Sequence, residues 1–207
     1  MNYLPLYLFV VLSATNIKTR VIEMNNIANA TKLTLAPLAL IYVLVNTSFD
    51  EKTQMLLIAS YSFYLIGDAF LLSHQPKLFG IGLVSFLCGH ICFIVIFFLY
   101  CVSFFYVPFI LIAVIYPFYK MFMVTRKAGK LRIPMLIYST MLVLFIAASS
   151  LLNNPFLIVG TSIFTLSDSF IAKNLCTKQN YGEFQIMGTY TLALILLSSG
   201  MIFQYLS

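Results

Sequence analysis

Residues 78–100 read LFGIGLVSFLCGHICFIVIFFLY, a run of 23 residues without one Asp, Glu, Lys or Arg. A transmembrane helix needs about 20 predominantly apolar residues to cross the hydrocarbon core of a bilayer. Similar runs, separated by short polar segments, recur along the 207 residues, of which 61% are hydrophobic and 9% charged. Soluble domains carry about 25% charged residues. The chain is therefore predicted to be an all-α, polytopic membrane bundle.

Eight apolar runs are long enough, or nearly so, to serve as transmembrane helices. We read the first as a span rather than a removed signal peptide, because no basic residue precedes it and no small-residue cleavage site follows it. One integral membrane domain, residues 1–207, is expected. The predicted spans are 3–15, 29–46, 53–73, 78–100, 103–123, 133–152, 155–173 and 184–206.

Basic residues are divided unequally between the two sides of this predicted bundle. Of the 12 Lys and Arg residues, 11 lie on the side that holds the loops after spans one, three, five and seven, and Lys52 lies on the other. The positive-inside rule then places both termini outside and the basic loops in the cytoplasm. Topology and lipid headgroups thus account for the net charge of +6, so membrane lipid is the expected partner and nucleic acid is not. The 11 residues are Lys18, Arg20, Lys32, Lys77, Lys120, Arg126, Lys127, Lys130, Arg132, Lys173 and Lys178.

An internal repeat relates the two halves of the chain at an offset of 100 residues. SFYLIGDAFL at 62–71 aligns without gaps on SIFTLSDSFI at 162–171, and at the same offset Lys32 meets Arg132 and His90 meets Tyr190. Units of about 1–100 and 101–207 would each hold four spans and enter the membrane in the same direction. We therefore predict a parallel repeat about an axis along the membrane normal.

Asp68 and Asp168 are the two acidic residues of six that lie inside predicted spans, at matching positions of the repeat. An ionisable side chain inside a membrane costs at least about 2.5 kcal/mol and usually faces the bundle interior or a wet cavity. Two carboxyls close together do not ionise independently, so one can hold a proton while the other is charged. That division suits general acid and base chemistry. The alternative is a structural pair held by hydroxyl groups.

Other polar residues could line the same interior. Tyr64 lies one helical turn before Asp68, and His90 shares a face with Gly82 and Phe86, although a buried structural histidine is the alternative. Lys32 is either a snorkelling residue or a partner for a phosphate headgroup. Two histidines in all do not supply a three-histidine zinc site, and the chain has no phosphate-binding glycine loop or nucleophile elbow. We expect no metal and no cofactor.

Five short motifs follow one another along the chain: Thr31-Lys32; Gly67-Asp68; Gly82, Phe86 and His90; Ser167-Asp168-Ser169; and Thr189-Tyr190. In their order and spacing they resemble the YhhN-type lysoplasmalogenases over nearly the whole chain. This sequence departs from the family pattern at two positions that bear on substrate detail: Leu33 replaces the proline usual after Thr-Lys, and Phe93 stands where a tyrosine is common.

The resemblance implies an eight-span ether hydrolase of a bacterial cytoplasmic membrane. Its lysophospholipid substrate would be lysoplasmalogen, cleaved at the vinyl ether bond to a fatty aldehyde and glycerophosphoethanolamine or glycerophosphocholine, without a metal. Asp68 and Asp168 would be catalytic. A proton-coupled transporter also uses paired intramembrane carboxylates and is the alternative, with a non-catalytic lipid-binding scaffold as a third interpretation. The expected substrate-binding residues are Lys32, Tyr64, His90, Arg132 and Tyr190.

Overall fold

Eight α-helices make up the computed structural model of the chain, which describes residues 1–73, 76–126, 129, 132–176 and 181–206. The all-α prediction is confirmed, and most helix ends lie within about one turn of the predicted spans. A 3₁₀ turn, Ser150–Leu152, extends the sixth helix. The helices are α1 (Leu4–Val21), α2 (Asn25–Leu44), α3 (Glu51–Leu71), α4 (Pro76–Leu99), α5 (Val107–Thr125), α6 (Arg132–Ser149), α7 (Pro155–Cys176) and α8 (Glu183–Leu206).

The end of α1 differs from the prediction, since the helix continues to Val21 rather than ending near residue 15. Its last turns contain polar residues, and two of these, Asn16 and Arg20, donate hydrogen bonds to α2. The Asn16 side-chain amide donates to the carbonyl of Ala28 at 2.5 Å and to Thr31 Oγ1 at 2.9 Å. Because these polar groups are hydrogen-bonded where the two helices pack, they do not end the helix.

Six helices are long and apolar enough to cross a membrane, counted over the described residues: α2, α3, α4, α6, α7 and α8. Large apolar side chains cover the outside of the bundle, among them Tyr7, Ile112 and Ile133, each about two-thirds exposed. A soluble protein would not expose so many. The chain is therefore an integral, multi-pass membrane protein.

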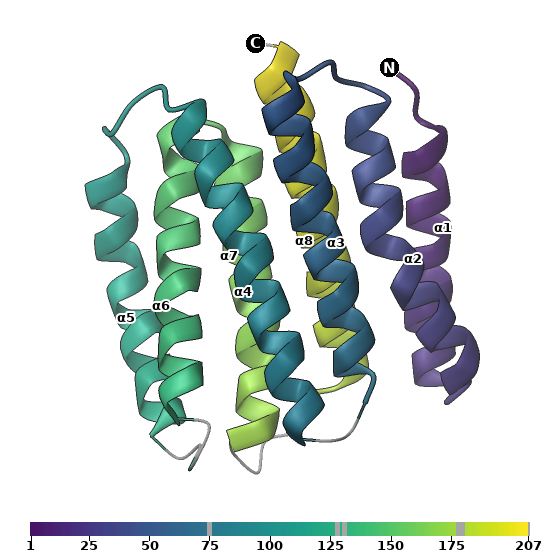
Figure 1. The fold of residues 1–207 in the computed structure, drawn as a ribbon. Helices are drawn as coiled ribbons and strands as arrows, with labels where there is room; N and C mark the ends of the chain where they lie inside the picture. The colour runs from purple at the N-terminus through teal and green to yellow at the C-terminus, as the bar shows by residue number, and fades with distance from the viewer. Residues whose placement is uncertain (74–75, 127–128, 130–131, 177–180, 207) are drawn as a thin grey trace.

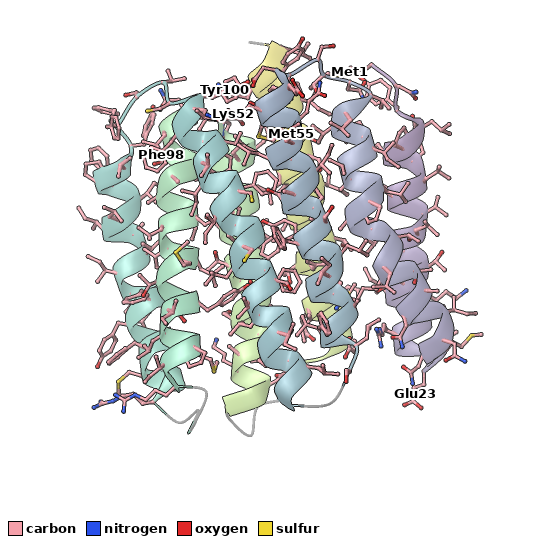
Figure 2. All side chains as sticks on the ribbon, in the orientation of Figure 1. Met1, Glu23, Lys52, Met55, Phe98 and Tyr100 are labelled. Carbon is pink, nitrogen blue, oxygen red and sulfur yellow. The ribbon has the colours of Figure 1, made fainter. Side chains whose placement is uncertain are left out.

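Successive helices run in opposite directions, so both termini lie at one end of the bundle (Figure 1). The last turns of α1, α3, α5 and α7 and the first turns of α2, α4, α6 and α8 lie at the opposite end, here called the basic end (Figure 1). Lys18, Lys173 and Arg132 stand in the last or first turns of helices that meet it, whereas Lys52 lies at the end that holds Met1 (Figure 2). Lys127, Lys130 and Lys178 lie outside the described residues.

Close packing of α3 on α4 depends on two glycines. A Cβ atom at Gly89 would lie 2.5 Å from the Tyr64 ring, and one at Gly67 would lie 2.7 Å from the Phe86 ring. These contacts are far shorter than normal van der Waals separations, so only glycine lets the two rings lie against the opposite backbone. Both rings belong to the core cluster next to Asp68, and the helix pair thereby fixes one wall of the polar site.

Candidate active site

Asp68 lies in the last turn of α3, near the basic end, and only 1% of its surface is exposed. Two helices provide its partners. From α2, Lys32 Nζ lies 3.2 Å from Asp68 Oδ1, and from α8 the Tyr190 hydroxyl donates a hydrogen bond to Asp68 Oδ2. A charged ammonium and a phenol thus satisfy both oxygens of a buried carboxylate, as an ionised group out of water requires.

Asp168 lies on α7 and is 9% exposed. The Tyr138 hydroxyl, from α6, donates to Asp168 Oδ2 at 2.5 Å. Sequence reasoning missed Tyr138, which stands in an apolar run 30 residues away from Asp168. The Leu38 position matches it at the repeat offset, so the repeat gave no sign of its role.

The two carboxyl groups lie within electrostatic range of each other and of Lys32. Asp168 interacts with both Asp68 and Lys32, and Tyr64 on α3 interacts with Asp168. Helices α2, α3, α6, α7 and α8 therefore each contribute a polar group to a single buried site. Two acids that are 100 residues apart in the chain have been brought together by the packing of the helices that carry them.

His90 is fully buried on α4. Its ring packs edge-on against Phe145 and Phe164, with centroids 4.6 and 4.9 Å apart, and lies 6.0 Å from the Tyr138 ring. Tyr64 is also fully buried, 5.4 Å from His90. Both residues border the polar groups through ring contacts alone, and their contact with a substrate stays a prediction.

Arg132, by contrast, is exposed in the first turn of α6 and does not join the cluster. Met135, one turn farther along α6, lines the pocket described below. The structure thus separates the two residues that the repeat aligned: Lys32 points at a carboxylate, and Arg132 stands at the basic end.

A pocket borders Asp168 between the basic ends of α3, α4, α6 and α7. Its empty space is about 390 Å³, part of which is open to the surroundings. The volume available to the centre of a water molecule is only about 20 Å³, which is room for about one water. Its lining is apolar apart from Asp168 and Tyr138, so the pocket offers hydrocarbon contacts beside one carboxyl group. The lining residues are Leu71, Phe79, Leu83, Phe86, Met135, Tyr138, Asp168, Ile171 and Ala172.

Potential metal ligands do not lie together within the described ranges. No group of three or more His, Cys, Asp or Glu residues lies together there. The described polar groups at the centre are two carboxyls, one ammonium and three phenols, a set suited to moving protons and balancing charge.

Comparison with known proteins gives one family. The sequence profile described as the YhhN family matches residues 27–201, a range that contains both aspartates and each of their partners. Curated proteins and solved structures give no significant match. Because the family match spans most of the sequence, the chain belongs to the YhhN family of membrane proteins, which includes the lysoplasmalogenases.

Proposed function

We propose that this protein is a membrane ether hydrolase that cleaves the vinyl ether bond of lysoplasmalogen, releasing a fatty aldehyde and glycerophosphoethanolamine or glycerophosphocholine. The observation that carries the proposal is that two buried carboxyl groups, Asp68 and Asp168, lie within electrostatic range of each other beside an apolar pocket. Hydrolysis of a vinyl ether requires a proton on carbon and forms an oxocarbenium ion. Two carboxyl groups meet both needs, as in glycosidases that pass through a similar cation.

We place the substrate in the site in one orientation. Its alkenyl chain would lie along the apolar pocket wall with the vinyl ether near Asp168, displacing side chains or using the open part of the pocket. The headgroup would then reach the basic end, where Arg132 is exposed. Tyr64, His90 and Tyr190 would shape the interior wall. A headgroup contact of Lys32 stays a prediction, because its ammonium lies against Asp68.

We further propose that all eight helices lie in a bacterial cytoplasmic membrane, with the basic end in the cytoplasm, as parallel four-helix units 1–100 and 101–207. If the units are equivalent, α2 corresponds to α6 and α4 corresponds to α8. The packing of α2 against α8 is then matched by the packing of α6 against α4, and both contacts are present, which supports the repeat. The rule that cytoplasmic loops are basic supports the orientation.

The first test is aldehyde release by purified protein in liposomes that contain lysoplasmenylethanolamine. We expect wild-type protein to release aldehyde, and Asp68→Asn and Asp168→Asn each to lower turnover by at least about a hundredfold, because each removes a proton-transferring or charge-balancing group. Wild-type rates in both variants would contradict the mechanism.

The same liposomes separate this function from proton-coupled transport. α3 and α7 run unbroken through the two aspartates, whereas transporters commonly bind ions at interrupted helices. We expect aldehyde without solute flux driven by a proton gradient. Flux without aldehyde would identify a transporter, and neither activity would indicate a non-catalytic scaffold.

A further inference from the structure

The two carboxyl groups have different partners, although they occupy equivalent positions in the repeat. Asp68 has an ammonium 3.2 Å from one oxygen and a phenol on the other. Asp168 receives its hydrogen bond from the Tyr138 phenol, at 2.5 Å. Arg132, which the repeat places opposite Lys32, is exposed instead of paired with Asp168. The site is therefore asymmetric in charge.

That asymmetry indicates where a proton resides. Two ionised carboxylates beside one ammonium would leave an uncompensated negative charge in a buried site, which is strongly unfavourable. The other described groups that interact with Asp168 are the phenols Tyr64, Tyr138 and Tyr190, which supply no positive charge. Lys32 contacts Asp68 and so compensates the negative charge of that carboxylate. A single bound proton on Asp168 then removes the remaining negative charge.

Access to the pocket gives the same assignment. Asp168 and Tyr138 both line the pocket, and Asp68 is not part of its lining. Tyr138 occupies Oδ2 of Asp168, which leaves Oδ1 to carry a proton. A substrate carbon in the pocket would therefore meet Asp168 first.

We propose, on the basis of the vinyl ether hydrolysis above, that Asp168 is the proton donor, that Tyr138 is the positioning residue that orients it, and that Asp68 is the ionised partner held by Lys32 and Tyr190. Asp168 gives its proton to the vinyl carbon that does not bear oxygen, and the carbon bonded to oxygen becomes an oxocarbenium ion. Water bonds to that carbon as Asp168, now ionised, takes one of its protons, while the negative charge of Asp68 balances the site. The hemiacetal then collapses: Asp168 returns its proton to the leaving alcohol oxygen and takes the hemiacetal hydroxyl proton, which restores the starting state.

Infrared spectroscopy of the protein in lipid nanodiscs locates the proton without relying on activity. We expect the carbonyl band of a protonated carboxylic acid at neutral pH, and its loss in Asp168→Asn. Tyr138→Phe should shift this band, whereas Tyr190→Phe, which removes the matching phenol from Asp68, should not. Tyr61→Phe is the control, since Tyr61 is a buried tyrosine whose hydroxyl is hydrogen-bonded to Ser198 Oγ at 2.7 Å. A band that is absent, or that shifts with Tyr190→Phe, would overturn the assignment.

Kinetics then test the role of Tyr138. Tyr138→Phe, which loses the hydrogen bond, should lower kcat about tenfold and change KM by no more than about twofold. In an Asp168→Asn background it should cause no further loss of kcat, since Tyr138 acts through that carboxyl. An additive loss, or a change confined to KM, would refute the positioning role. If wild-type protein releases no aldehyde, the hydrolase proposal fails, while the infrared result still decides which carboxyl holds the proton.

Discussion

Lys32 is the charged residue on which the site depends most directly. Its side chain and that of Asp68 are 11% and 2% exposed, and the loss of one partner from a buried ion pair costs about 3–5 kcal/mol, because the other charge remains unpaired. We expect Lys32→Met to lower the Tm clearly and Lys32→Met with Asp68→Asn to recover most of the loss. Thermal unfolding in detergent measures both, and a double variant no more stable than the single would argue against the pair.

A substitution of Lys32 also distinguishes two interpretations of its role, a contact with the substrate headgroup and a counter-ion for Asp68. A headgroup contact requires Lys32→Ala to raise KM with little effect on kcat. A counter-ion for Asp68 requires the opposite, a fall in kcat with KM nearly unchanged. The 3.2 Å contact favours the second result, which steady-state assays with a headgroup-bearing substrate would decide.

Asp50, which precedes α3 outside the spans, gives a prediction of pH dependence. Hydrogen bonds from Thr53 and Tyr100 hold the pKa of its carboxyl below the ordinary value. Such a group stabilises the fold above its unfolded pKa of about 3.9, and this contribution is lost as pH falls through the lowered folded value. Asp50→Asn, which keeps a helix-capping side chain, should therefore be less stable than wild type at neutral pH, and the difference should vanish in acid. A pH-independent difference would contradict this role.

At the scale of helices, the α3–α4 contact determines where Tyr64 lies. Gly89→Ala would place a methyl group 2.5 Å from the Tyr64 ring, and overpacking of this kind costs about 1–3 kcal/mol. We expect a lower Tm and reduced turnover, because the shifted ring adjoins the Asp168 cluster. Gly188→Ala on α8 is the matched control, since a Cβ there meets no atom within 4 Å. Equal effects of the two substitutions would show that the contact is unimportant.

Sequence periodicity and hydropathy were sufficient to predict the helices, but not which side chains of different helices come into contact. The eight apolar runs follow from the bilayer length, and the position of Asp68 and Asp168 inside spans follows from their apolar surroundings. The pairing of Tyr138 with Asp168 depends on how α6 packs against α7, which local sequence does not encode. The burial of Lys32 and exposure of Arg132 likewise reflect three-dimensional packing, so the two aligned basic residues have different environments.

At the scale of the molecule, the bundle gathers buried polar groups from five helices into one centre near its basic end. The family match covers residues 27–201 and so includes every residue of that centre but no residue of α1. The cluster needs both halves of the chain, because Asp68 accepts a hydrogen bond from Tyr190 on α8 and interacts electrostatically with Asp168 on α7. We therefore expect neither half to be active alone.

The most direct test of a shared catalytic centre is a double-mutant cycle on aldehyde release from lysoplasmalogen. If Asp68 and Asp168 act as one unit, Asp68→Asn with Asp168→Asn should be about as slow as the slower single variant, since residues that act together are not additive. Losses that multiply, so that the double variant falls by the product of the two single effects, would show that the carboxyls work independently and would contradict the account.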